Sequence, residues 1–129
     1  MRELPGEWRG LWDGLNRALG RKWGVHVIRL LAAEPRGFND LRRALDGPTA
    51  KTLSERLTEL RCVGLVERHV EATSPPSTRY ELTRAGERFA RLLGELEAEV
   101  ELVDCGCEDD CEMISVDPER TAAALAEEC

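Results

Sequence analysis

The sequence has few of the features that mark exported, membrane-spanning or enzymatic chains. Its apolar runs stop after a few residues, short of the roughly 20 apolar residues that a membrane helix needs. The start, Met1 to Gly6, lacks the charged beginning and continuous apolar stretch of a secretion signal. We also find no Gly-rich phosphate loop and no pairing of a nucleophile with a base. These absences predict a cytoplasmic protein that contacts no membrane and is not an enzyme.

Lysine is scarce as well, since only Lys22 and Lys51 stand beside 16 arginines. The net charge is −7, but it is divided unevenly along the chain. Residues 1–93 carry 17 Lys or Arg against 12 Asp or Glu, whereas residues 94–129 carry Arg120 alone against 13 acids. An electrostatic footprint is a local property of a face or segment. The negative total therefore does not exclude a polyanionic partner for the basic body.

Helical periodicity dominates the first third of the chain. Apolar residues recur at three- and four-residue spacing over residues 7–19 and again over 22–33, which predicts two amphipathic helices. A short third helix is expected to be capped by Asn39 or Asp40 and to end near Leu45. The turn that follows it makes a helix pair with the next segment.

The fourth predicted helix has the clearest boundaries. Thr49 is a favoured N-cap residue, and Gly64 is a favoured residue just past a helix C-terminus. Between them Leu53, Leu57 and Leu60 repeat at one face of a helix, which leaves a polar face opposite.

The remaining pattern predicts a β-hairpin and two more helices. Residues 65–70 and 78–82 read as two short strands around a polar tip. Thr83 is a fair helix start, and the apolar stripe that follows is expected to continue for about five turns, to Val103. A short terminal helix is predicted over residues 119–128.

The order of four helices, two strands and a helix contains that of a winged helix-turn-helix. The predicted fold class is therefore mainly α with a small β-hairpin. We expect a DNA-binding and dimerisation domain over residues 1–103 and an acidic, cysteine-bearing tail over residues 104–129.

Five segments in matching order and spacing carry a family resemblance between residue 19 and about residue 93. They are Leu19-Gly20-Arg21-Lys22-Trp23, Phe38-Asn39-Asp40-Leu41-Arg42-Arg43, Lys51-Thr52-Leu53-Ser54-Glu55-Arg56-Leu57, Gly64-Leu65-Val66-Glu67-Arg68, and Pro75-Pro76 followed by Tyr80-Glu81-Leu82-Thr83. This stretch resembles the HxlR family of bacterial and archaeal regulators, relatives of the MarR-type winged helices. The resemblance implies a homodimer, built through its N- and C-terminal helices, that binds a palindromic operator in double-stranded DNA and regulates transcription.

The resemblance also implies which residues contact DNA. The helix that begins at Thr49 would enter the major groove, and the hairpin would contact the backbone or the minor groove. Strand alternation leaves open whether Arg79 points toward the DNA or away from it. The candidate contacts on the helix and the hairpin are Thr49, Lys51, Thr52, Ser54, Glu55, Arg56, Ser77, Thr78 and Arg79.

Two departures from the family concern cysteine. Many members carry a Cys-Pro near the N-terminus, whereas the corresponding stretch here is Leu4-Pro5-Gly6-Glu7. The family also generally ends soon after its last helix, so the resemblance implies nothing about the tail beyond residue 103. This tail holds four of the five cysteines, Cys105, Cys107, Cys111 and Cys129.

Three interpretations of these four cysteines stay open. Their thiolates could bind one soft ion or cluster, with zinc, copper(I), arsenite and an iron-sulfur cluster as candidates. They could instead form a reversible disulfide switch, or be exposed thiols without a role. The acids around them attract cations but disfavour the thiolate form. Either chemistry would place a modulating site next to the predicted dimer helix.

The other cysteine and the two histidines carry no predicted function. We expect Cys62 to be a small, partly buried helical residue. His26 and His69 lie at no ligand spacing from a cysteine. An alternative function for the whole chain is a metal-binding or thiol-redox protein that uses the winged helix for protein contact, and a milder variant is an architectural DNA binder without a preferred operator.

Overall fold

The computed structural model describes residues 3–104 and 112–128. The chain divides into two compact units, Met1–Ala90 and Arg91–Cys129, and the long helix α5 continues from the first unit into the second. The predicted division between residues 103 and 104 stays a prediction. Within the described residues, no helix is both long and apolar enough to cross a membrane.

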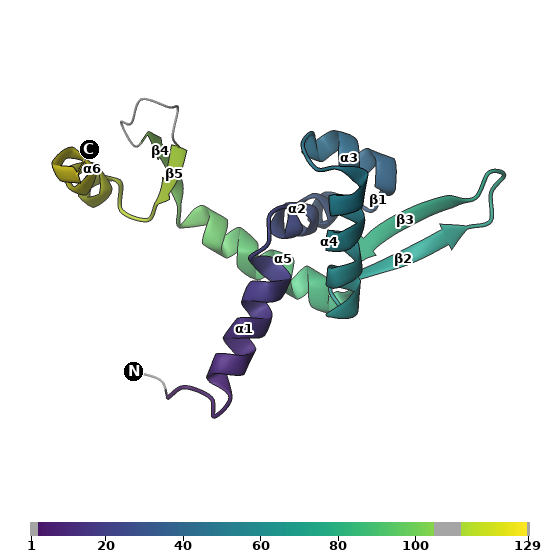
Figure 1. Cartoon of the computed structure of the whole chain (residues 1–129), viewed down its shortest axis with the longest axis horizontal. Coiled ribbons are helices and arrows are strands. Elements are labelled where there is room, and N and C mark those ends of the chain that lie inside the picture. The colour runs from purple at the N-terminus through teal and green to yellow at the C-terminus, as the bar shows by residue number, and fades with distance from the viewer. Residues whose placement is uncertain (1–2, 105–111, 129) are drawn as a thin grey trace. The chain divides into compact units, whose positions relative to one another are not determined.

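The first unit is mainly helical with a small antiparallel sheet, which confirms the predicted fold class (Figure 1). The sheet has the strand order β1-β3-β2, and the β2–β3 hairpin projects away from α2, α3 and α4. Its elements are α1 (Trp8–Leu19), α2 (Gly24–Ala33), β1 (Arg36–Gly37), α3 (Phe38–Leu45), α4 (Ala50–Cys62), β2 (Val66–Glu71), β3 (Ser77–Leu82) and the start of α5 (Arg84–Ala98).

The core of this unit lies where α4 packs against α2 and the sheet, with α3 packed on α2 and the sheet beside it. The predicted leucine stripe of α4 is buried, with Leu53, Leu57 and Leu60 at most 1% exposed. Full burial of one such side chain contributes about 1.5–3 kcal/mol, so this stripe fixes how α4 is held. The other buried apolar residues are Val27, Ile28, Leu31, Leu41, Leu65, Val66, Tyr80 and Leu82.

Local signals determine both ends of α4. The Thr49 hydroxyl oxygen accepts a hydrogen bond from the Thr52 backbone N–H at 3.1 Å, as expected of an N-cap. After Val63, Gly64 has φ of +85°, a left-handed conformation that glycine adopts without strain. The chain therefore turns directly from α4 into β2.

The start of α5 is fastened to the same turn. The Thr83 hydroxyl donates to the Gly64 carbonyl at 2.5 Å and accepts from the Gly86 N–H at 3.0 Å. This confirms Thr83 as the helix start. At the other end α5 finishes at Ala98, and Val103 lies in a strand, so the prediction of a helix reaching Val103 was wrong.

The second unit contains a second hairpin and a terminal helix. β4 (Glu101–Asp104) pairs antiparallel with β5 (Glu112–Ser115), and α6 spans Pro118–Glu128. The terminal helix was predicted, but the strand pair was not. β1 was missed too, and the cap of α3 was misplaced, because Gly37 is the N-cap and Asn39 and Asp40 lie inside the first turn.

Candidate nucleic-acid interface

The polar face of α4 is the first part of the candidate interface. Lys51, Ser54 and Glu55 are exposed on it, and Thr49 is exposed at its N-terminus. Thr52 is half-buried, and its backbone N–H and its hydroxyl both bond to the Thr49 hydroxyl. The burial of the leucine stripe orients this face to solvent, where a helix of this kind can enter a major groove.

Arg56 occupies a different environment from the other predicted contacts. Its side chain is only 13% exposed, and its Nη1 lies 2.8 and 2.7 Å from the two carboxylate oxygens of Glu59. Glu59 also accepts a hydrogen bond from Arg21 at 3.0 Å. The two arginines and Glu59 thus form an ion-pair network that holds the guanidinium of Arg56 along the helix surface.

The hairpin β2–β3, hereafter the wing, presents its predicted residues in two directions. Ser77 and Thr78 line a polar hollow toward α3, with Thr78 half-buried. Arg79 is half-exposed on the same face of β3 as Ser77 and on the face opposite to Thr78, as strand alternation requires, and its Nη1 lies 3.6 Å from Glu71. Its guanidinium therefore faces a carboxylate on the wing itself.

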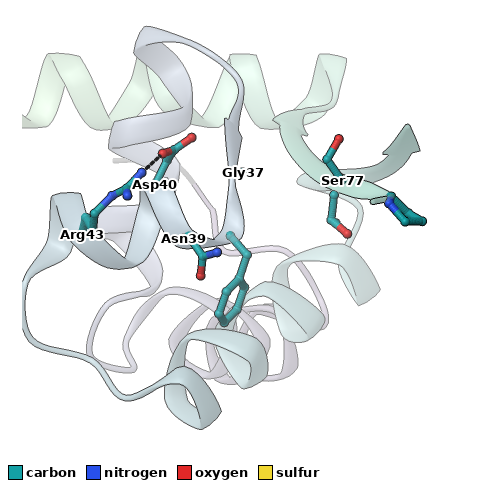
Figure 2. A pocket seen from close by; sticks show the side chains of 8 residues that line it. Gly37, Asn39, Asp40, Arg43 and Ser77 are labelled. Atoms are coloured by element: carbon teal, nitrogen blue, oxygen red, sulfur yellow. Dashed lines mark hydrogen bonds and ion pairs between the residues drawn. The ribbon is translucent and has the colours of Figure 1, made fainter. Parts of the chain in front are cut away.

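The hollow between α3 and the wing has a volume of about 490 Å³. Figure 2 shows Asn39, Asp40 and Arg43 on one side of it and Ser77 across from them on the strand. Arg43 forms an ion pair with Asp40. Phe38 and Pro76 also line the hollow, so its walls combine polar groups, of the kind that can contact a phosphate–sugar backbone, with two apolar side chains.

The sequence reasoning missed α3 as part of this surface. Arg42 and Arg43 are exposed on α3, and with Asn39 and Asp46 they line a second polar hollow. The first helix of a helix-turn-helix crosses the DNA backbone, so the signal was present in the exposed arginine pair that follows Leu41.

The cysteines divide between the two parts of the chain. Cys62 is exposed, so the expectation of partial burial was wrong. It lines a mostly apolar hollow of about 320 Å³ with residues of α1, among them Gly14 and Ala18. The predicted cysteine site of the tail lies outside the described residues, and its members are Cys105, Cys107, Cys111 and Cys129.

Comparison with known proteins identifies the class of protein to which this geometry belongs. Residues 18–103, two thirds of the chain, match the family described as HxlR-like helix-turn-helix. The chain belongs to this family, whose members are DNA-binding transcriptional regulators and not enzymes. The predicted resemblance is therefore confirmed.

Individual relatives support the same assignment. An HTH-type transcriptional regulator of Halalkalibacterium halodurans, BH0655, is 39% identical over 79 residues, covering 60% of this chain and 70% of its own. YodB of Bacillus subtilis, an HTH-type transcriptional regulator, is 31% identical over 80 residues, covering 62% of this chain and 71% of its own.

Solved structures agree with the fold. The reduced form of YodB from B. subtilis superposes with a TM-score of 0.64 at 26% identity, over 82% of this chain and 97% of that one. The redox regulator HypR in its oxidised form superposes with a TM-score of 0.64 at 25% identity, over 68% of this chain and 91% of that one. The chain is a transcriptional regulator with a winged-helix fold.

Proposed function

We propose that the protein binds a palindromic operator as a homodimer, with α4 of each copy in the major groove. The observation that carries the proposal is the exposed polar face at the start of α4, beside the exposed arginines of α3. A helix N-terminus with free backbone N–H groups also favours a phosphate. On this proposal Lys51 and Ser54 contact bases or phosphates, and Glu55 accepts from a cytosine amino group.

The other predicted contacts take more specific parts in this proposal. Thr49 and Thr52 hold the start of α4 and bring it to the backbone. Ser77 and Thr78 contact the backbone from the wing, while Arg79 contributes through its pair with Glu71. Arg56 positions the helix surface through Glu59.

The apolar faces of α1 support a homodimer. α1 has no buried residue, and its large apolar side chains Leu11 and Trp12 are 55% and 58% exposed. In the second unit, Leu92 and Leu96 of α5 are 61% and 59% exposed. Soluble monomers rarely leave such side chains uncovered in groups. We therefore propose that a second copy of the chain covers them and sets the spacing of the two α4 helices.

DNA binding is tested by fluorescence anisotropy on fragments of the promoter upstream of the protein's own gene. The native protein should bind one fragment far more tightly than random DNA, with affinity falling steeply as salt rises. Lys51→Ala should weaken binding about tenfold and reduce the salt dependence by about one phosphate contact. Arg88→Ala, which removes an exposed cation from α5, is the matched control. Equal affinity for random DNA would support an architectural binder, and no binding at low salt would overturn the proposal.

We further propose that the four tail cysteines modulate operator affinity. One structural neighbour, HypR, is a redox regulator, which supports the disulfide switch. The close spacing of the tail thiols instead supports a soft metal or a cluster. Elemental analysis and thiol titration on protein purified without air separate the two. Stoichiometric zinc, copper, arsenic or iron supports a thiolate site, and metal-free protein that oxidises reversibly in thiol pairs supports a switch. The alternative, a metal or redox protein without DNA binding, requires the anisotropy test to fail.

A further inference from the structure

Three metal-ligating side chains meet on the outer face of the wing. Glu67 and His69 lie two residues apart on β2, so they project to the same side of the strand. Glu81 of β3 is the direct cross-strand partner of Glu67. The hairpin register therefore brings the three together, opposite the face that packs on the core.

The distances between their ligand atoms suit a single ion. His69 Nε2 lies 2.7 Å from Glu81 Oε1 and 3.7 Å from Glu67 Oε1. One ligand atom from each residue lies within 4.8 Å of the others. Imidazole nitrogen and carboxylate oxygen bind zinc at about 2.0–2.2 Å, so two ligands of one ion are about 3–3.5 Å apart. Side-chain movements of under about 1 Å would complete that geometry.

The charges around the cluster favour a cation. Two carboxylates face one imidazole, and each side chain is between 34% and 48% exposed, so the group is open to solvent and to ions. Arg79 is the cross-strand partner of His69, but its guanidinium lies 3.6 Å from Glu71, farther along the hairpin. Arg79 thus pairs with Glu71, whereas Glu67 and Glu81 pair with His69.

We propose that Glu67, His69 and Glu81 bind one divalent transition-metal ion, of the kind that takes nitrogen and oxygen ligands. Zinc, cobalt, nickel and manganese belong to this class, whereas copper(I) and arsenite prefer thiolates. Water would fill the remaining coordination positions. The site differs from the tail cysteines in ligand chemistry, because it contains no sulfur, and in position, because it lies on the wing.

Metal binding has a consequence that rests on the proposed DNA-binding function. The ion neutralises two carboxylates on an element that approaches the phosphate backbone. Loss of like-charge repulsion strengthens binding to a polyanion, and the ion also ties β2 to β3 and stiffens the wing. The wing then acts as a metal-sensitive contact that is independent of the tail.

The site is tested by a titration with Co²⁺, followed by competition with Zn²⁺. The protein used is the whole chain in which the four tail cysteines have been changed to serine. We expect one equivalent to bind, with weak visible absorption and no thiolate charge-transfer band. His69→Ala and Glu81→Gln should each weaken binding at least about tenfold. Glu95→Gln on α5 and His26→Ala on α2 remove the same groups away from the wing and should leave metal binding unchanged. Circular dichroism checks that each variant is folded.

The proposed metal site is wrong if Co²⁺ does not bind. It is also wrong if binding persists in folded His69→Ala and Glu81→Gln variants. The DNA consequence is measured separately, by operator affinity with and without Zn²⁺. A gain of several-fold that His69→Ala abolishes supports the role on the wing. Unchanged operator affinity with a filled site overturns that role alone, whereas failure to bind DNA in either state overturns the proposed function and leaves the metal site standing.

Discussion

Nη1 of Arg56 lies 2.7 Å from a carboxylate oxygen of Glu59, one turn later on the same helix. The pair is mostly shielded from solvent, with Arg56 13% and Glu59 29% exposed. Arg21 approaches the same carboxylate at 3.0 Å and ties it to the segment between α1 and α2. The pair therefore connects α4 to the rest of the first unit.

We expect Arg56→Ala to lower stability more than it lowers intrinsic operator affinity. Charge-assisted hydrogen bonds of partly buried groups contribute about 1.5–3 kcal/mol, so the free energy of unfolding should fall by about that much. Urea denaturation measures it, and anisotropy on fully folded protein measures affinity. The double variant with Glu59→Ala gives the coupling energy. A tenfold loss of affinity at unchanged stability would instead make Arg56 a direct DNA contact.

Thr49→Ala should destabilise α4 from its N-terminus. The substitution removes the hydrogen bond from the Thr52 N–H, and loss of such a cap costs about 1 kcal/mol. Thermal unfolding should show a melting temperature lower by a few degrees. Thr58→Ala is the control, because Thr58 lies in the interior of the same helix with its hydroxyl bonded to the Ser54 carbonyl. It should be neutral or slightly stabilising, and equal losses in both variants would refute the capping role.

Gly86→Ala should strongly destabilise the first unit. A Cβ at Gly86 would lie 2.0 Å from the carbonyl oxygen of Leu65, so backbone must move. Such overpacking costs about 3 kcal/mol or more. Gly94→Ala, on the same helix with nothing within 4 Å of the new Cβ, should stabilise by about 0.5–1 kcal/mol. Chemical denaturation measures the free energy of unfolding of both variants. A mild effect of Gly86→Ala would contradict the close approach of Gly86 to the Leu65 carbonyl.

Trp12→Glu should convert the proposed dimer into a monomer. The indole is 58% exposed on α1, and a carboxylate buried there against a second copy would be desolvated without a partner. Sedimentation velocity at micromolar concentration measures the change. Gly10→Glu adds the same charge on the opposite side of α1, where a new Cβ meets nothing within 4 Å, and should remain dimeric. A native protein that sediments as a monomer would rule out the dimer at that concentration.

Replacing Cys105, Cys107 and Cys111 with serine should abolish any response of operator affinity to metal or oxidant at the tail, and leave basal binding intact. The reason is that the proposed modulation requires thiolates, whereas α4 and the wing require none. Anisotropy with and without diamide or a thiophilic metal measures the response. Cys62→Ser and Cys129→Ser test the two remaining thiols, and a response that persists without Cys105, Cys107 and Cys111 would locate the sensor elsewhere.

Much of the first unit could be predicted from the sequence because its signals are local. The leucine stripe of α4, its Thr49 cap and the Thr83 start of α5 depend on residues within a turn or two of one another. Their order along the chain was enough to predict a winged helix. The helix expected to reach Val103 failed because an apolar stripe alone does not show where β pairing replaces helix.

Only the tertiary structure decided the contacts between distant segments. Arg36 pairs with Tyr80 to form β1 because the hairpin edge lies beside the start of α3, a relation that no local pattern records. The Glu67, His69 and Glu81 cluster depends on a strand register, and a slip of one residue would turn the side chains of one strand to the other face. The sequence by itself thus determined which helices form and in what order. The tertiary structure determined which charged side chains meet, because those meetings depend on packing across the chain.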